Sequence, residues 1–381
     1  MKIVIAPDKF KGTLTAAEAA RALADGLTAA LPDQHPDLVL RPMADGGEGT
    51  LEALAGSCNR LPVAEAHDAL GRPIRCRYGI TTEADAPAAL LEAAATIGLQ
   101  HLAPGERNPL RTSSYGFGEA LRTALEAGCR RCTVTIGGSA TSDCGAGLLA
   151  ALGCLFRTPE GTPLPRPTGA DLIRIVAIDP APLRHRLDGC RIRVLSDVDN
   201  PLLGPHGAAA VFAPQKGADA EAVRQLEAGA AHFAALTERT LGRNCAEVPG
   251  SGAAGGIGWA LLTYCDAELT AGADYVARHI GLEEALADAS LVITGEGCFD
   301  RQSLHGKVVA RVAALAARHA IPTFVLCGTR RDTIAPEALS AAGISGVVAL
   351  TDRVSPAEAV ARPALHLAAA AADLLRRLII R

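Results

Sequence analysis

The sequence predicts an α/β protein with two domains: a discontinuous Rossmann-like domain built on a parallel sheet, and a large mixed α/β domain inserted into it. Short aliphatic runs alternate with helical segments near both ends of the 381-residue chain, which is the rhythm of a parallel sheet. Between them the expected strands are unevenly spaced, the loops are long, and residues 158–167 are rich in proline. We therefore expect residues 1–75 and 288–381 to form the first domain and residues 76–287 the inserted one.

The N-terminal segment predicts a strand, a loop and a helix. Residues 2–7 form a short aliphatic run, which favours a strand. Thr15 and Glu18 have the spacing of a capping box, and an alanine- and leucine-rich helix is expected to follow over residues 16–30. A second strand is predicted at residues 38–43 and leads into a glycine-rich loop.

The C-terminal third repeats this alternation. Strands are predicted at residues 291–294, 323–327 and 346–350, and helices at residues 307–319, 336–342 and 356–377. A glycine-containing loop is expected at residues 295–300, directly after the first of these strands. Spacing this regular is typical of a doubly wound domain.

Composition excludes several classes of function. Hydrophobic residues make up 49% of the chain and aromatic residues only 3%, so the cores must be aliphatic. The formal net charge is -4 and no basic stripe is present, which argues against nucleic acid as a partner. No apolar run approaches the ~18–20 residues of a membrane span. The first apolar run is about four residues long, too short for a signal peptide, so we expect a cytoplasmic protein. The sequence leaves open whether it is a monomer or a homodimer.

The cysteines predict free thiols. Their number, 11, is odd, and they are scattered along a chain long enough to bury a core without disulfides. Cys129 and Cys132 form a C-x-x-C pair, but no second pair or histidines at ligand spacing follow. We interpret this pair as incidental.

Four loops combine glycine with acidic residues, serine or threonine. They span residues 45–50, 137–147, 249–258 and 294–300. Glycine lets successive backbone N–H groups point at an anion, and the hydroxyls add donors. The carboxylates are suited to a magnesium ion that in turn holds phosphates. Walker A and protein-kinase motifs are absent, so any phosphoryl transfer must use these loops as its phosphate cradle.

Two acidic clusters and the lysines add candidates. Asp8 lies just after the first predicted strand, where ligands bind in open α/β sheets. Asp197 follows the aliphatic run 192–195, a suitable place for a general base or a metal ligand. The chain has five lysines, Lys2, Lys9, Lys11, Lys216 and Lys307. Four of the five adjoin glycine-containing loops, where a compact ammonium group suits phosphate or carboxylate oxygens.

Two other functions remain open at this point. Residues 250–255 fit the G-x-G-x-x-G pattern of an NAD-dependent dehydrogenase of a small hydroxy acid. That fingerprint needs a strand directly before it, and residues 243–249 are polar and end in Pro249. A non-catalytic anion-binding protein is the other alternative. The carboxylates in the glycine loops argue against it, because they repel an anion unless Mg²⁺ is present.

Taken together, these segments resemble the bacterial glycerate kinase family (type 1, glycerate 2-kinases), which includes enzymes of glyoxylate and glucarate breakdown. The resemblance covers nearly the whole chain and rests on seven segments in order: residues 6–16, 41–50, 136–147, 197–208, 211–218, 249–258 and 294–307. It implies ATP and Mg²⁺ as co-substrate and cofactor, and D-glycerate as acceptor. It also implies 2-phosphoglycerate as product, with 3-phosphoglycerate less favoured, and a fold of two α/β domains.

Within this resemblance we assign roles as hypotheses. The ATP phosphates are expected at Gly137, Gly138, Ser139, Thr141, Gly255, Gly256 and Lys307. Substrate binding is expected at Asp8, Lys9, Asp45, Gly46 and Gly47. Candidate Mg²⁺ ligands, directly or through water, are Asp45, Glu48 and Glu296. Asp197 is the first candidate for the general base and Asp300 the second, and Lys11 would neutralise charge on phosphate or on the glycerate carboxylate.

Overall fold

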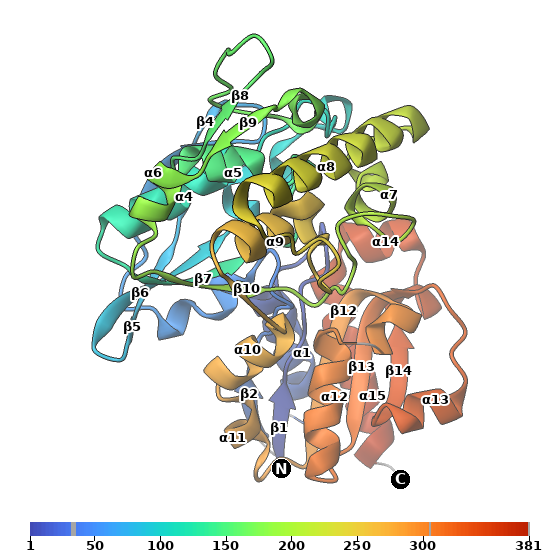
Figure 1. Cartoon of the computed structure of the whole chain (residues 1–381). Helices are drawn as coiled ribbons and strands as arrows, with labels where there is room; N and C mark the ends of the chain where they lie inside the picture. Colours follow the sequence, from blue (N-terminus) through green and yellow to red (C-terminus); the bar gives the residue numbers. More distant parts are fainter. Residues whose placement is uncertain (32–35, 305, 380–381) are drawn as a thin grey trace. The chain divides into compact units, whose positions relative to one another are not determined.

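The structure is a computed structural model that describes residues 1–31, 36–304 and 306–379. It is of mixed α/β class, as predicted, and the chain divides into two compact units (Figure 1). Unit 1 comprises Met1–Asp45, Glu52–Gly56 and Ala271–Arg381, and unit 2 comprises Gly46–Leu51 and Ser57–Thr270. Unit 1 is therefore discontinuous in sequence. The short helix α2 (Thr50–Ala53) and the 3₁₀ turn Ala55–Ser57 cross these residue boundaries.

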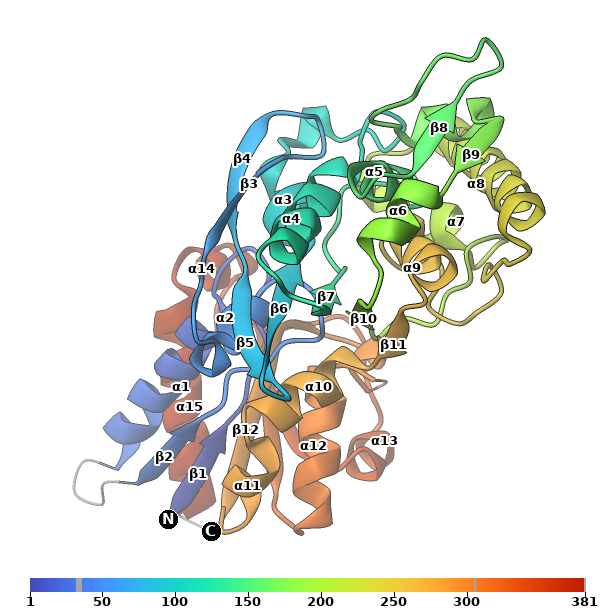
Figure 2. The ribbon, with the colours of Figure 1, turned by 60° about the vertical axis from the view of Figure 1, so that its left-hand side comes forward.

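The first predicted boundary, between residues 75 and 76, differs from the boundary of the units. The strands β3 (Val63–His67) and β4 (Pro73–Arg77) pair as an antiparallel hairpin. This hairpin packs along helix α4 (Tyr115–Glu126), which belongs to unit 2 (Figure 2). The sequence between residues 57 and 75 therefore lies with the inserted unit, because its apolar positions are covered there.

The second predicted boundary, between residues 287 and 288, differs as well. The helices α10 (Gly272–His279) and α11 (Leu282–Leu286) both pack against α12 (Val308–Arg318). They consequently belong to unit 1, which resumes at Ala271. Helical periodicity predicts that such segments are amphipathic, but it does not identify the surface that covers the apolar face.

Unit 1 is built on a five-stranded parallel sheet. Its strands, in spatial order, are β14 (Ile344–Ala349), β13 (Thr323–Arg330), β12 (Leu291–Phe299), β1 (Lys2–Ile5) and β2 (Asp37–Leu40). All four neighbouring pairs are parallel. The chain moves outward from β1 to β2 and then resumes on the other side of β1 at β12. The position between β1 and β12 is thus the switch point of a doubly wound order, outside which ligands bind.

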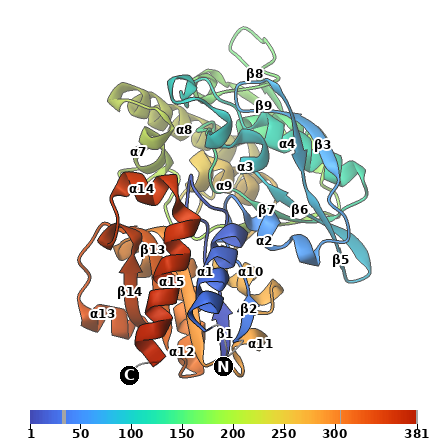
Figure 3. The ribbon, with the colours of Figure 1, turned by 180° about the vertical axis from the view of Figure 1, so that it is seen from behind.

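Helices cover both faces of this sheet. Helix α1 (Ala16–Ala30) begins at the predicted capping box, in which Thr15 and Glu18 each accept a hydrogen bond from the other's backbone N–H. It packs against α15 (Pro363–Ile379) on one face (Figure 3). A side chain at Gly26 of α1 would overlap the carbonyl of Ala368, so glycine permits this close crossing. Helix α12 lies on the opposite face (Figure 1).

Three predicted elements of unit 1 are corrected by the structure. β2 ends at Leu40 instead of residue 43. The predicted C-terminal helix is interrupted: α14 (Pro356–Ala361) ends before Pro363, which cannot continue a helix because it lacks an N–H. The predicted loop at residues 295–300 is mostly strand, since β12 continues to Phe299, whose partner is Arg330. Helix α13 (Pro336–Ala341) and the 3₁₀ turns Arg301–Leu304 and Leu350–Asp352 complete the unit.

Unit 2 is built on a second five-stranded sheet. Its spatial order is β11 (Glu268–Thr270), β10 (Arg191–Leu195), β7 (Arg131–Thr135), β6 (Ala86–Glu92) and β5 (Gly79–Glu83). Only β5 is antiparallel to its neighbour. A small hairpin, β8 (Leu155–Arg157) with β9 (Ala177–Asp179), lies outside this sheet. The mixed strand directions agree with the irregular spacing of the sequence in this region.

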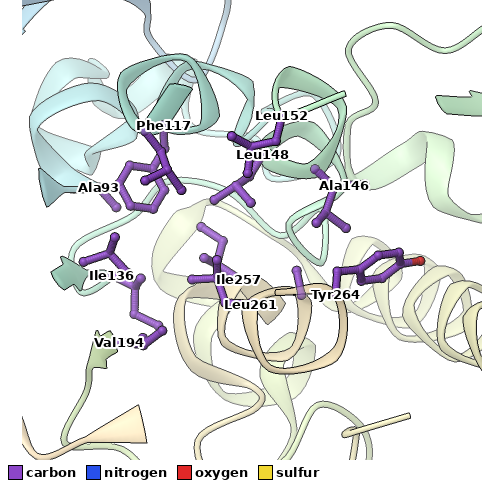
Figure 4. Close-up of a cluster of buried hydrophobic side chains, with 14 of the residues drawn as sticks. Ala93, Phe117, Ile136, Ala146, Leu148, Leu152, Val194, Ile257, Leu261 and Tyr264 are labelled. Atoms are coloured by element: carbon purple, nitrogen blue, oxygen red, sulfur yellow. The ribbon is translucent and has the colours of Figure 1, made fainter. Parts of the chain in front are cut away.

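The helices of unit 2 enclose a core that is mostly aliphatic and includes a small aromatic cluster. They are α3 (Ala94–Ile97), α4, α5 (Ala146–Ala151), α6 (Ala181–Arg186), α7 (Ala208–Phe212), α8 (Ala220–Leu241) and α9 (Ala253–Tyr264), with 3₁₀ turns at Leu99–His101, Pro104–Glu106, Gly169–Arg174 and Pro214–Lys216. In Figure 4, Ile136, which follows β7, and Val194 of β10 lie near Phe117 of α4, Leu148 of α5 and Ile257 of α9, and all five side chains are buried. No helix in the described part of the chain is long and apolar enough to span a bilayer.

Candidate active site

The switch point of the unit 1 sheet carries several of the predicted residues. The backbone N–H of Asp8, just beyond β1, donates to the carbonyl oxygen of Gly295 on β12 at 2.8 Å. Asp8 therefore lies beside Gly295 and Glu296 at the carboxyl edge of the sheet. A side chain at Gly295 would overlap the carbonyl of Leu326, so the glycine that predicted a loop instead allows close pairing of β12 with β13.

Three predicted substrate-binding residues are brought together here. The Lys9 Nζ atom lies 3.8 Å from Asp8 Oδ1 and 3.7 Å from Asp45 Oδ1. Burial, together with the negative charges of Asp45 and Glu296, raises the pKa of Asp8 to about 7, although the charge of Lys9 opposes this shift. Asp8 therefore exchanges its proton near neutral pH, where an ordinary aspartate is fully ionised.

Glu296 is the other acidic residue at this edge. Burial raises the pKa of its carboxyl group, and hydrogen bonding by Ser303 lowers it. Its Oε1 atom is buried and has no hydrogen-bond partner among the described residues. Of the predicted magnesium ligands, Asp45 and Glu296 belong to unit 1 and Glu48 belongs to unit 2. Within residues 1–31, 36–304 and 306–379, no three His, Cys, Asp or Glu side chains form a group that could hold a metal ion.

The remaining unit 1 candidates follow β12. Asp300 Oδ1 accepts a hydrogen bond of 2.8 Å from the backbone N–H of Gln302, so this carboxylate is used to cap a turn. Lys307 precedes the first turn of α12, and its Nζ lies 3.4 Å from Gln302 Oε1. Lys11 is exposed. His305, which is part of the glycerate-kinase-like segment 294–307, lies outside the described residues.

In unit 2 the predicted loops lie at the carboxyl edge of the parallel strands. Thr135, the last residue of β7, pairs with Glu92 at the end of β6 and with Leu195 at the end of β10. The loops that follow β7 and β10 therefore start side by side. One of them contains Gly137 and the other contains Asp197, which is half-buried.

The first glycine loop is attached to the same edge. A methyl group added at Gly137 would lie 2.9 Å from the Cα atom of Gly47, so these two glycines bring their backbones into contact. Thr50 Oγ1 donates to the Gly47 carbonyl at 2.7 Å, and the Thr50 N–H donates to Glu92 Oε1 at 3.1 Å. Gly46, Gly47 and Glu48 are thereby held next to the loop that begins at Gly137.

The glycines of α9 have a packing role. Ala254, Gly255 and Gly256 have positive φ angles of 56°, 68° and 89°, so the regular helix begins after them. Side chains at Gly255 would overlap the carbonyl of Thr141, and the Cys144 N–H donates to the Gly255 carbonyl at 3.0 Å. The two predicted phosphate cradles are thus in direct contact, and backbone packing is sufficient to require glycine at residue 255.

Two buried charged residues of this region received no role from the sequence. Lys216 is 2% exposed, and its Nζ donates to the Thr141 carbonyl at 2.6 Å and to Ser139 Oγ at 3.3 Å. Burial lowers its pKa to about 8, and the charge of Asp143 opposes this. Two features of the sequence could have indicated Lys216: lysine is rare in this chain, with only five residues, and Lys216 directly precedes a glycine. The contacts themselves join residues more than 70 positions apart and leave no local pattern.

Asp143 is fully buried and joins two helices. Its Oδ2 atom accepts hydrogen bonds from the Ser114 N–H and hydroxyl, both at 2.7 Å, and from the Gly147 N–H at 3.1 Å. Its Oδ1 atom accepts from the Gly145 N–H at 3.2 Å. Ser114 precedes α4 and Gly145 precedes α5, so one carboxylate accepts hydrogen bonds from backbone N–H groups at the N-termini of both helices.

The dinucleotide-binding alternative lacks its structural context. The first glycine of its G-x-G-x-x-G pattern, Gly250, follows residues 243–249, which form no strand. The pattern instead packs Gly252 against the carbonyl of Pro201. This agrees with the expectation that residues 243–249 form no strand, which is the context that a dehydrogenase fingerprint needs.

Comparison with known proteins identifies relatives along nearly the whole chain. The model of the glycerate kinase family matches residues 3–379. A glycerate kinase of Bacillus subtilis is 43% identical over 331 residues, covering 86% of this chain and 85% of the relative. A glycerate 2-kinase of Escherichia coli is 40% identical over 338 residues, covering 88% of this chain and 87% of the relative. A crystal structure from Salmonella typhimurium LT2, provisionally described as glycerate kinase 2, has a TM-score of 0.79 and 39% identity, and the match covers 100% of this chain and 98% of that one. On this basis, the chain belongs to the glycerate kinase family.

Proposed function

We propose that this protein transfers a phosphoryl group from ATP to D-glycerate and forms 2-phosphoglycerate. The observation that carries the proposal is the group formed by Asp8, Lys9 and Asp45 at the switch point of the unit 1 sheet. A small hydroxy acid has hydroxyls that donate to carboxylates and a carboxylate that pairs with an ammonium group. The carboxylates of Asp8 and Asp45 can accept from the substrate hydroxyls, and the Lys9 ammonium group can pair with the substrate carboxylate. Gly46 and Gly47 follow Asp45 directly and let the backbone approach the same substrate.

ATP phosphates are assigned to the unit 2 loop that begins at Gly137. Its glycines expose backbone N–H groups, and Ser139 and Thr141 supply hydroxyls. We extend this assignment to Gly255 and Gly256, which contact the same loop. Lys11 and Lys307 are proposed to neutralise negative charge on the phosphates or on the glycerate carboxylate. Phosphoryl transfer in this chain would then proceed without a Walker A loop.

The carboxylates fit a magnesium ion. Glu296 has a buried oxygen with no hydrogen-bond partner among the described residues, and the pKa of Asp8 is raised partly by the nearby charges of Asp45 and Glu296. Such an oxygen-rich group favours a hard cation. Mg²⁺ is usually held by one or two carboxylates together with substrate phosphates and water, so a three-carboxylate cage is not required. We propose Asp45 and Glu296 as ligands, with Glu48 as a further candidate; the ion would neutralise charge on the transferred phosphoryl group.

Asp197 is proposed as the general base. It follows β10, next to the loop that begins at Gly137, and it is half-buried. In the proposed step the glycerate C2 hydroxyl gives its proton to the Asp197 carboxylate while its oxygen bonds to the γ-phosphorus. The bond from that phosphorus to the bridging oxygen breaks, and ADP leaves. Asp300 is the second candidate, but one of its oxygens already caps the turn at Gln302.

A coupled assay of ADP release tests this function. With D-glycerate, ATP and Mg²⁺ we expect steady ADP formation, and omission of either glycerate or Mg²⁺ should reduce it to background. ADP formation that does not depend on glycerate would identify an ATPase instead and would overturn the assignment. We also propose a cytoplasmic location and a monomeric or homodimeric state, which fractionation and sedimentation velocity can test.

A further inference from the structure

Lys216 places a positive charge in the interior of unit 2. Its ammonium group has three N–H donors, and the structure gives it two acceptors, the Thr141 carbonyl and Ser139 Oγ. No ion pair of Lys216 is present in the part of the chain that the structure describes. Asp143 acts on it through charge, but the Asp143 oxygens already accept four hydrogen bonds. The ammonium group is therefore buried without a counter-ion in contact.

The backbone holds this lysine in place. Lys216 ends the 3₁₀ turn Pro214–Lys216, and the next residue, Gly217, has a φ of +96°. A side chain at Gly217 would overlap the carbonyl of Arg107, so only glycine fits. The local packing thus fixes where the lysine side chain starts, and its end meets the loop that begins at Gly137.

The same loop contains two buried hydroxyls without a hydrogen-bond partner among the described residues, Thr141 Oγ1 and Ser142 Oγ. Thr141 is also the residue whose carbonyl accepts from Lys216. Native proteins pair nearly all such groups, and exceptions point to a bound ion, water or ligand. An anion is the ligand that supplies both the acceptor oxygens and the missing negative charge.

We propose that Lys216 is a positioning residue for the nucleotide: it fixes the loop of residues 137–142 and supplies the buried positive charge that holds the terminal phosphates of ATP there. Through its hydrogen bond to Ser139 Oγ it also leaves the proton of that hydroxyl available to a phosphate oxygen. This inference rests on the proposed kinase function. The proposed phosphate site thereby gains the charge of Lys216 and the buried hydroxyls of Thr141 and Ser142. The hydrogen bonds of Lys216 also explain how the loop keeps its conformation.

The test compares Lys216→Met and Lys216→Arg with the unmodified protein. Nucleotide affinity is measured by calorimetry with ADP and a non-hydrolysable ATP analogue, and KM is measured for each substrate. Methionine keeps the length of the side chain and removes its charge. We expect Lys216→Met to weaken nucleotide binding and raise KM for ATP at least ~10-fold, as loss of a charged hydrogen bond predicts, with little change in KM for glycerate. Lys216→Arg should recover part of the affinity.

The pH dependence separates a role of the charge from a purely structural role. Among the described residues, the charge that acts on the ammonium group is that of Asp143. As the pH rises above about 8, Lys216 loses its proton, so the unmodified protein should lose nucleotide affinity while Lys216→Met does not change. Parallel pH profiles for the two proteins would overturn the inference.

Ser139→Ala provides a second variant if Lys216→Met fails to fold. It removes the hydroxyl that accepts from Lys216 and should weaken nucleotide binding several-fold. Ser113→Ala is the matched control, because its buried hydroxyl donates to the Pro167 carbonyl at 2.7 Å; it should lower stability and leave nucleotide affinity intact. Equal affinity in Ser139→Ala and the unmodified protein contradicts the inference. A protein that binds nucleotide through Lys216 but phosphorylates no glycerate would overturn only the proposed function.

Discussion

Asp8 and Asp45 lie at nearly equal distances, 3.8 Å and 3.7 Å, from one ammonium group, that of Lys9. One positive charge thus stands between two carboxylates, and Glu296 adds a third negative charge to their surroundings. Such an arrangement is unfavourable in the free protein and favourable once a cation or a hydroxyl donor binds. Sites of this kind exchange stability for function.

Asp8→Asn should stabilise the protein at alkaline pH and impair the enzyme. The pKa of Asp8 is about 7 in the folded state against an ordinary value of 3.8, so the folded state binds more protons between these values. The free energy of unfolding of the unmodified protein therefore falls as the pH rises through this window, and the full destabilisation is present above pH 7. Asparagine removes this effect. We expect Tm at pH 8 to rise by at least ~2 °C, with a smaller gain at pH 5.

Thermal unfolding at both pH values, together with kinetics, checks this prediction. The catalytic efficiency of Asp8→Asn with glycerate should fall at least ~10-fold, because a substrate hydroxyl loses its charged acceptor. Asp25→Asn is the control, since Asp25 is an exposed residue of α1 and should change neither quantity. A lower Tm for Asp8→Asn at pH 8 would contradict the destabilisation that we infer from burial of the ionised Asp8 carboxylate near other negative charges.

Asp197→Asn should lower kcat by at least ~10²-fold, the lower end of general acid–base contributions. The substrate KM values should change less, because the side chain keeps its shape. Asp199→Asn serves as the control in the same loop, since Asp199 is exposed. Asp300→Asn should have a smaller effect than Asp197→Asn. If Asp300→Asn instead gave the larger loss of kcat, the two base candidates would have to be exchanged.

Gly137→Ala should damage two predicted binding loops at once. Its new methyl group would lie 2.9 Å from the Cα atom of Gly47, which forces the two backbones apart. We expect a loss of roughly 1–3 kcal/mol in the free energy of unfolding, as for other overpacked sites, and a higher KM for both ATP and glycerate. Gly105→Ala is the control, because no atom lies within 4 Å of a side chain there. Denaturant unfolding and initial rates measure both effects, and an increase in KM for one substrate only would show that the loops act separately.

Thr141→Val and Thr323→Val form a matched pair in the two units. Each removes a buried hydroxyl that has no hydrogen-bond partner within the described residues, and valine keeps the shape of the side chain. Neither change should destabilise the protein, since removal of an unsatisfied polar group is neutral or favourable. Only Thr141→Val should weaken nucleotide binding. Calorimetry that finds the same affinity for both variants would exclude the Thr141 hydroxyl as a phosphate donor.

The sequence predicts elements well where the signal is local. Thr15 and Glu18 form the predicted capping box, and α1 ends at Ala30 as expected. Lys307 and the start of α12 also agree with the prediction, because the aliphatic pattern and its boundary lie in one short segment. The interruption at Pro363 was equally local, and the predicted continuous helix over 356–377 overlooked it.

Glycine predicted the structure less well, because it occurs both in ligand-binding loops and where two backbone segments pack closely together. At residues 295 and 297 it predicted a loop, whereas the structure uses it to bring neighbouring backbones together while β12 continues to Phe299. At Gly255 it predicted a phosphate cradle, and the structure gives it a packing contact with Thr141. A single sequence does not distinguish backbone approach to a ligand from backbone approach to another strand or loop.

The sequence suggested candidate site residues, but it gave no role to the buried charges. Asp8, Lys9 and Asp45 were assigned to substrate binding within the family resemblance, and the structure places their side chains close together. Lys216 and Asp143 gained roles only from contacts between distant parts of the chain. Their importance depends on burial and on missing counter-charges, and neither quantity can be read from residue spacing.

The most direct test of the proposed activity is ³¹P NMR of a reaction that contains the purified protein, ATP, Mg²⁺ and D-glycerate. We predict that the γ-phosphate signal of ATP is replaced by one phosphomonoester signal, coupled to the single proton on C2 of glycerate, in an amount equal to the ADP formed. Coupling to the two C3 protons would contradict the proposed C2 product. Inorganic phosphate as the only product, or no consumption of ATP, would contradict the assignment of a glycerate kinase activity to this chain.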